Sequence, residues 1–169
     1  MIPPKARRTD TRPPPLTKAD WLDVALQVLV EDGIEAVQIT RLTRSLHVTR
    51  GSFYWHFRDR GDLLNALLDE WKSRNTGLMK NALDTAKTLT EGILSLFLVW
   101  VDKEPFNRHL DQAVRDWARH SQAVNDAVSH EDDNRIEVIR AFFSRFGFVE
   151  PEAFIRARVI YFTPVSYTH

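Results

Sequence analysis

Residues 39–57 read ITRLTRSLHVTRGSFYWHF, and no other segment is as informative about the fold. Its pattern predicts one short helix over 39–46 and a second over 50–57, with three residues between them. Two helices joined by so few residues cannot pack antiparallel, so they cross steeply, as in a helix-turn-helix. The apolar side chains that can form the core of this unit are Leu42, Leu46, Val48, Phe53 and Phe57.

The polar residues between these apolar positions suit contact with DNA. Thr49 can cap the second helix, whose N-terminus also favours a phosphate. Arg50 and Ser52 stand at the start of that helix, where side chains reach base edges in a major groove. Taken singly, the aromatic residues are also typical of a core and the charges of a solvated face, but their combination favours DNA binding. Rings and hydrogen-bond donors for sugar and phosphate come from Tyr54, Trp55 and His56.

The charge of the chain is unevenly distributed. There are 23 basic and 23 acidic residues, so the formal net charge is zero. Residues 1–16 carry four basic residues against Asp10, which gives +3, and residues 39–60 carry five arginines against Asp59, which gives +4. The remainder therefore sums to −7. A basic N-terminal part beside an acidic remainder favours DNA binding by one end of the molecule.

Length and composition exclude several classes of protein. With 169 residues, the chain suffices for one or two small domains with a buried core. It has no cysteine, which excludes a disulfide framework, a thiolate zinc site and a cysteine nucleophile. The longest apolar run, 93–101, is about half the ~20 residues that a membrane span needs. Because no signal peptide, nucleophile elbow, P-loop or dinucleotide fingerprint is visible, we expect a cytoplasmic protein that is not an enzyme and has no cofactor or metal.

The rest of the chain is also predicted to be helical, so the fold class is all-α. Thr17 and Asp20 have capping-box spacing at the start of a helix that Gly33 ends. Asp59 can cap a fourth helix, and Pro151 suits the first turn of a last helix that runs through Phe162. Further helices are predicted over 93–101, from Pro105 onward, over 113–128 and over 136–146, with the acidic residues 131–133 as caps for a helix from Asn134.

Three parts follow from these patterns. Residues 1–16, rich in proline, are predicted to be a disordered basic tail, with a basic arm that lies along DNA as the alternative. Residues 17–60 are predicted to be a three-helix helix-turn-helix DNA-binding domain, and residues 61–169 a second helical domain.

The segment from Leu16 to Trp71 resembles the DNA-binding domain of TetR-family transcriptional regulators. The resemblance rests on DWLDVALQVLVEDGIEAV (20–37) and VTRGSFYWHFRDRGDLL (48–64), which follow the family's first helix, its turn, its recognition helix and its entry to helix four. It implies a ligand-responsive regulator, a repressor, that binds a palindromic operator in double-stranded DNA as a homodimer. It also implies that residues 61–169 form a ligand-binding and dimerisation domain.

The resemblance carries roles over to single residues. The positions that it matches to contacts with bases or nearby backbone are Arg50, Gly51, Ser52 and Tyr54. The positions that it matches to phosphate contacts are Thr49, Trp55, His56 and Arg60, the last in place of a family lysine.

Three positions depart from the family pattern. His47 stands where the turn usually has a glycine in the left-handed conformation, which costs about 1 kcal/mol for a histidine. Thr43 replaces an alanine where two helices touch, and Gln38 is a poor cap. We expect His47→Gly and Thr43→Ala each to raise the melting temperature.

In the second domain, aromatic residues are the candidates for lining an effector pocket, although each one singly is more typical of core packing. Such a pocket would take an apolar or flat molecule, which shifts the population to a dimer whose recognition helices no longer match one turn of DNA, ~34–36 Å. The last two long helices, about 132–146 and 151–163, would pair across the dimer axis. Pro164 is expected to break the final helix, which indicates a truncated or altered C-terminus. The pocket candidates are Trp71, Phe97, Trp100, Phe106, Trp117 and Phe143.

Two other functions stay open on the sequence. One is a helical interaction module whose helix-turn-helix has lost DNA binding, because His47 and Thr43 weaken the match. The other is a small-molecule enzyme that uses the C-terminal pocket, although no catalytic constellation supports it.

Overall fold

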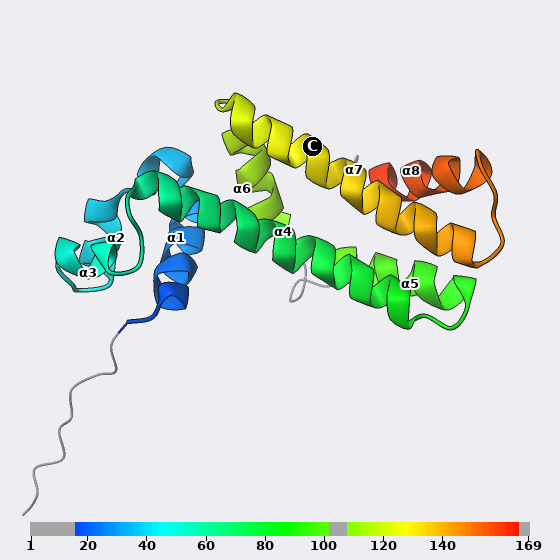
Figure 1. The fold of residues 1–169 in the computed structure, drawn as a ribbon, viewed down its shortest axis with the longest axis horizontal. Helices are drawn as coiled ribbons and strands as arrows, with labels where there is room; N and C mark the ends of the chain where they lie inside the picture. The colour runs from blue at the N-terminus through cyan, green and yellow to red at the C-terminus, as the bar shows by residue number, and fades with distance from the viewer. Residues whose placement is uncertain (1–15, 102–107, 166–169) are drawn as a thin grey trace, which may run out of the picture.

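The computed structural model describes residues 16–101 and 108–165 (Figure 1). Every regular element in these two ranges is helical, which confirms the predicted all-α class. The elements in chain order are α1 (Lys18–Asp32), the 3-10 turn η1 (Ile34–Ala36), α2 (Ile39–Ser45), α3 (Arg50–Tyr54), α4 (Arg60–Thr85), α5 (Leu89–Val101), α6 (Arg108–Ala118), α7 (Gln122–Arg145) and α8 (Glu152–Val165).

The predicted capping signals of α1 are confirmed at both ends. Thr17 and Asp20 form a capping box, in which the Asp20 amide donates to Thr17 Oγ1 and the Thr17 amide donates to Asp20 Oδ2 at 2.6 Å. At the other end, Gly33 takes a φ of 77° and its amide donates to the Leu29 carbonyl. The length of α1 is therefore set locally, by residues at its own ends.

α2 and α3 form the predicted helix-turn-helix, and both helices are shorter than expected. α2 ends at Ser45 and α3 at Tyr54. Thr49 is the N-cap residue of α3, but its hydroxyl makes no capping hydrogen bond, so the capping role predicted for that side chain is wrong. The predicted small core is confirmed: three of its five side chains are buried and the other two pack against them. These are Leu42, Phe53 and Phe57, and then Leu46 and Val48.

His47 lies in the left-handed region, with a φ of 54°, as its position in the turn predicts. Since glycine reaches this conformation without a Cβ clash, we expect His47→Gly to raise the free energy of unfolding by about 1 kcal/mol. Chemical denaturation measures this. His130→Gly is the matched control, because that exposed histidine lies inside α7 and glycine there should destabilise by roughly 0.5–1 kcal/mol. A lower stability for His47→Gly would contradict the placement of the turn.

The effect of Thr43→Ala stays a prediction. Thr43 is buried between the helices, and its hydroxyl donates to the Thr40 carbonyl at 3.1 Å. The side chain is thus satisfied where it lies.

α4 is the long central helix of the molecule (Figure 1). Two hydrophobic cores lie along it. Asp59 caps it as predicted, with Oδ1 accepting from the Asp62 amide at 2.9 Å. The first core joins α1, α2 and α3 with the first half of α4, and it includes α6 and the start of α7. The second core joins the second half of α4 with α5, the end of α7 and α8. The two cores therefore do not separate at residue 60, where the boundary between the two predicted domains lies.

α7 differs most from the prediction. It is one helix from Gln122 to Arg145, whereas the pattern predicts separate helices over 113–128 and 136–146. The acidic residues 131–133 lie inside it, because Glu131 bonds to α4 and Asp132 bonds to α6. α8 continues through Pro164 to Val165, so the expected break at this proline is wrong within the part of the chain that is described.

Two further points complete the fold. Within the described ranges, no helix has the length and apolar character needed to cross a membrane. The basic tail apart from Leu16, and the pocket candidate Phe106, lie outside the described residues. Leu16 is half-buried against the first core.

Candidate nucleic-acid interface

α3 is anchored by one buried ring and presents several of its predicted DNA-contacting residues to solvent. Phe53 is fully buried, with its ring centroid 5.4 Å from those of Trp21 and Phe57. On the other side, Tyr54 is 57% exposed and Trp55 is 88% exposed. An indole that exposed contributes little to folding, so α3 carries an aromatic side chain that the core does not use. The remaining exposed or half-buried residues of this surface are Thr49, Arg50, Gly51 and Ser52.

His56 is only half-buried, and it belongs partly to the interior. Its ring centroid lies 6.4 Å from that of Trp21, a buried residue of α1. Seven of the eight predicted contact residues lie within residues 49–56, and His56 is the one of them that also packs against the interior. The eighth, Arg60, is the first residue of α4.

A hollow of about 420 Å³ lies beside α3, between the start of α2 and the start of α4. Arg50 and Tyr54 form the side that belongs to α3, and Gln38 and Thr40 form the side that belongs to α2. Gln38 does not cap α2, which agrees with the prediction that it is a poor cap. Its side-chain amide group instead donates to the Glu35 carbonyl at 3.0 Å. The remaining lining residues are Glu35, Ile39 and Arg60.

Arg60 lies at this hollow, and its guanidinium is bonded to the protein's own backbone. Nε donates to the Val37 carbonyl at 2.6 Å, and Nη2 donates to the Ile34 carbonyl at 2.8 Å. These contacts span more than twenty residues of sequence. The sequence pattern gave no sign of them, because a charged residue at the start of a helix is expected to face solvent.

The aromatic pocket candidates do not gather around one cavity. Trp71 and Trp117 lie in the first core, Trp100 and Phe143 lie in the second, and Phe97 is 38% exposed on α5. Phe143 alone of these borders an apolar groove of about 520 Å³ between α5 and α8. The other apolar residues of that groove, which the sequence analysis missed, are Leu89, Ile93, Pro151, Ile155, Val159 and Ile160.

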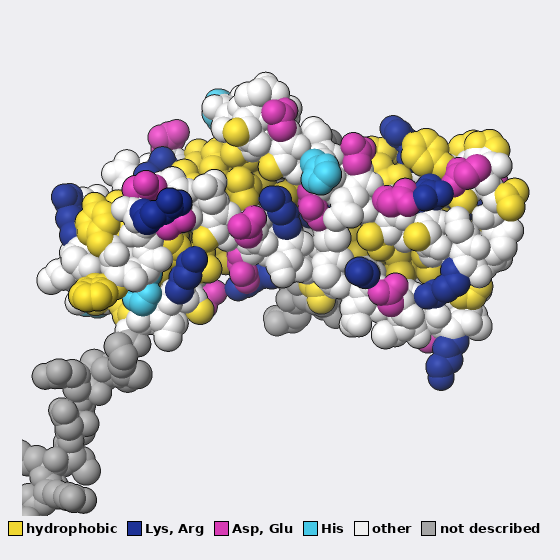
Figure 2. Space-filling model, viewed as in Figure 1, with side chains coloured by type: hydrophobic (Ala, Val, Ile, Leu, Met, Phe, Trp, Pro, Cys, Tyr) yellow, Lys and Arg dark blue, Asp and Glu magenta, His cyan; other side chains and the backbone are white. Residues whose placement is uncertain are grey.

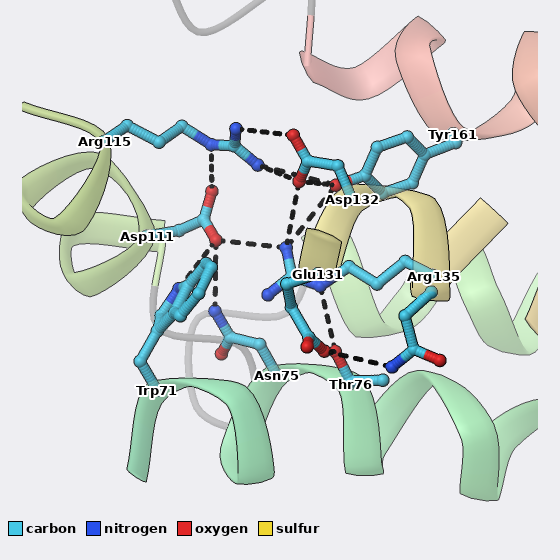
Figure 3. A network of polar contacts seen from close by, with 10 residues as sticks. Trp71, Asn75, Thr76, Asp111, Arg115, Glu131, Asp132, Arg135 and Tyr161 are labelled. Atoms are coloured by element: carbon cyan, nitrogen blue, oxygen red, sulfur yellow. Dashed lines mark hydrogen bonds and ion pairs between the residues drawn. The ribbon is translucent and has the colours of Figure 1, made fainter. Parts of the chain in front are cut away.

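A buried polar network connects α4 to α6, α7 and α8 (Figure 3). Its centre is Arg135 of α7, whose side chain is 2% exposed. Arg135 Nη1 donates to Asp111 Oδ1 at 3.2 Å, and Nε donates to Thr76 Oγ1 at 2.9 Å. Asp111 Oδ1 also accepts from Trp71 Nε1 at 2.9 Å, and Thr76 donates to Glu131. Trp71 is therefore held in place by a polar contact as well as by the core.

The outer half of the network joins Arg115, Asp132 and Tyr161. Arg115 donates to both carboxylate oxygens of Asp132, at 2.9 and 2.7 Å, and through Nε to Asp111 at 2.8 Å. The Tyr161 hydroxyl donates to Asp132 at 2.6 Å. Burial raises the pKa of Tyr161 to about 12, so the phenol stays a neutral donor at physiological pH.

The charges of the network determine the protonation state of Asp111. Burial by itself raises the pKa of this carboxyl, but Arg115 and Arg135 outweigh burial and hold the pKa below its ordinary value. The network was not predicted from the sequence. The available signal was the spacing of opposite charges on single helices, four residues for Asp111 and Arg115 and three for Asp132 and Arg135.

The geometry defines a class: a helix-turn-helix domain, with an exposed second helix, joined through a long helix to an all-helical domain. The sequence of residues 22–67 matches the family described as "Bacterial regulatory proteins, tetR family". Over 51 residues the chain is 35% identical to the HTH-type transcriptional regulator AcrR of Shigella flexneri, which covers 30% of this chain and 24% of that protein. Over 52 residues it is 36% identical to the HTH-type transcriptional regulator SrpR of Pseudomonas putida, with 31% and 24% covered. The match thus spans about a quarter of these relatives' length.

Solved structures extend the likeness to the rest of the chain. The reduced form of E. coli NemR has a TM-score of 0.73 at 16% identity and covers 88% of this chain and 84% of that one. A transcriptional regulator (TerR/AcrR family) from Aquifex aeolicus VF5 has a TM-score of 0.70 at 15% identity, covering 88% and 82%. At these identities the likeness shows the fold alone. Residues 22–67 thus match the tetR family, and the described part of the chain has the fold of these two solved structures.

Proposed function

We propose that this protein is a cytoplasmic, ligand-responsive transcriptional repressor, and not an enzyme, that binds a palindromic DNA operator as a homodimer. The observation that carries the proposal is the surface of α3. Phe53 anchors the helix in the core, while Arg50, Tyr54 and Trp55 stand exposed beside it. Arginine suits guanine edges and phosphates, and exposed rings suit sugar and base surfaces, so this face fits a major groove.

The proposed dimer contact is the outer face of α8. One side of this helix is buried against the rest of the chain through Ala153, Ala157 and Tyr161. The opposite side is also apolar, and hydrophobic side chains reach the surface over this end of the molecule (Figure 2). Arg158 also lies on this side, with its guanidinium 5.6 Å and 5.4 Å from the ring centroids of Phe154 and Phe162. Exposed rings on a helix that is already buried on one side suit contact with a second partner, and a two-fold related copy supplies one. The exposed apolar residues of the outer face are Phe154 and Phe162, whereas Ile155 and Val159, which are also exposed, border the groove between α5 and α8.

The proposed effector is an apolar or aromatic small molecule that binds in the helical domain. The groove between α5 and α8 supports this, since its lining is mainly aliphatic and includes the ring of Phe143. The effector would favour one arrangement of the dimer and so shift the spacing of the two α3 helices away from one turn of DNA, ~34–36 Å.

A binding titration of the intact protein on duplex DNA, followed by gel shift at several salt concentrations, tests the proposal. We expect binding at low salt, with an affinity that falls steeply as salt rises because arginines displace counterions from phosphates. Arg50→Ala should weaken the preference for the selected sequence. A folded, dimeric protein without salt-dependent affinity for any duplex would contradict the proposal, and would favour a helical interaction module.

A further inference from the structure

Arg60 connects two parts of the first domain that are distant in sequence. It is the first residue of α4, and its two donors reach the carbonyls of Ile34 and Val37, which belong to η1 and the residue after it. Val37 is completely buried. The guanidinium therefore fixes the backbone just before α2 begins, from the start of a different helix.

The entrance to α2 has two other side-chain contacts, neither of which caps the helix: Gln38 donates to the Glu35 carbonyl, and Arg41 pairs with Asp32 of α1. Gln38 is its N-cap residue, and the Gln38 side chain makes no capping bond. The first amides of α2 instead rely on backbone geometry, with those of Arg41 and Leu42 donating to the Gln38 carbonyl at 2.9 and 3.0 Å. Because Val37 directly precedes Gln38, the bond from Arg60 to the Val37 carbonyl orients this carbonyl and the helix that follows it.

The same bonds bear on how the chain meets DNA. Arginine recognises a phosphate best through two parallel N–H groups, and in Arg60 Nε and Nη2 are both directed at backbone carbonyls. We propose that Arg60 is a positioning residue, which fixes the entrance of α2 and through it the orientation of α3, and that it is not a phosphate contact. This inference rests on the proposed function for its effect on DNA, and on the fold alone for its effect on α2.

The position of Arg60 on α4 gives the contact a second consequence. Trp71, Asn75 and Thr76 lie further along the same helix, within the polar network of α6 and α7. The distance along α4 from Arg60 to Trp71 is about 16 Å, at 1.5 Å per residue. α4 is therefore the element that joins the polar network to the α2 entrance.

Hydrogen exchange on the protein without DNA tests the structural half. In Arg60→Lys and Arg60→Met we expect the amides of Val37, Arg41 and Leu42 to exchange about tenfold faster or more, since two charge-assisted bonds are lost or reduced. The amides of α1 should keep their wild-type rates. The matched control is Arg58→Met, an exposed arginine that pairs with Asp62 and should leave α2 unchanged. Unchanged exchange at the α2 entrance in both Arg60 variants would overturn the inference.

Salt dependence on a duplex selected by the wild-type protein from a random library tests the DNA half. A positioning residue predicts that Arg60→Lys, although it keeps the charge, loses affinity much as Arg60→Met does, and that both keep the wild-type slope of log affinity against log salt. A phosphate contact predicts instead that Arg60→Lys retains affinity and that Arg60→Met reduces the magnitude of the slope by about 1.8, which is about 0.9 for each of the two protomers. The second pattern would overturn the inference while leaving the proposed function intact, and absence of wild-type binding would contradict only the proposed function.

Discussion

Replacing Arg135 by methionine should lower the free energy of unfolding by about 3–5 kcal/mol, the range for removing one partner of a buried ion pair. Arg135 is 1% exposed, and methionine is long enough to fill much of its volume. The loss of stability therefore comes from the polar partners of Arg135, which remain without it. Asp111 would lose its contact with Nη1, and Thr76 would lose the donor that orients it toward Glu131. Chemical denaturation measures the change.

A surface arginine provides the control for Arg135→Met. Arg119 pairs with Asp116 at 3.6 Å and its side chain is 66% exposed, so Arg119→Met should change stability by less than about 1 kcal/mol.

The effect of Arg135→Met should also depend on pH. The folded-state pKa of Asp111 is lowered, so its ionic contribution is complete above the unfolded value, ~3.9, and is lost as the pH falls through the lower folded value. The difference in the free energy of unfolding between wild type and Arg135→Met should therefore become smaller as the pH falls from ~3.9 through the folded-state pKa of Asp111. A constant difference at all pH values would mean that packing, and not the ionic contacts, accounts for the loss.

Phe154→Glu should convert the proposed dimer into a monomer and lower the affinity for a palindromic operator by about 10²–10⁴-fold. Phe154 is 42% exposed on the outer face of α8, so the substitution removes its ring from the proposed contact and places a carboxylate there, which must lose its water in a dimer even beside Arg158. The loss of affinity follows because two linked DNA-binding domains gain from avidity, which a monomer lacks. Sedimentation gives the oligomeric state, and a binding titration gives the affinity.

Leu94→Glu is the matched control for Phe154→Glu. Leu94 is 58% exposed on α5, so the same apolar-to-acidic change is made at an exposed position on a different helix. It should leave both the oligomeric state and the DNA affinity unchanged. If Phe154→Glu remains a dimer with wild-type affinity, the two-fold contact does not involve the outer face of α8.

The features that the sequence predicted correctly are those that depend on neighbouring residues. The capping box of α1, the left-handed His47 and the apolar spacing from Leu42 to Phe57 are all local, and each is confirmed. The exposure of Tyr54 and Trp55 also agrees with adjacent positions on a helix. Local pattern is a sufficient guide there because backbone geometry over a few residues decides the outcome.

The features that the sequence could not predict depend on partners far along the chain. The acidic residues 131–133 have the sequence pattern of helix caps. In the structure they bond to Thr76 and Arg115, and α7 continues through them. The position of Arg60 in the sequence suggests an exposed phosphate contact, whereas in the structure its guanidinium donates to the carbonyls of Val37 and Ile34. The aromatic candidates failed to form one pocket for a related reason, since helical spacing does not tell which of two cores a ring enters.

The most direct test of the account is a footprint of the intact protein on an operator selected from a random duplex library. We expect two symmetric protected half-sites in successive major grooves, ~34–36 Å apart, and loss of this protection in Arg50→Ala. A single unsymmetric site, or no selected sequence from a folded protein, would contradict a dimeric regulator that reads DNA through α3.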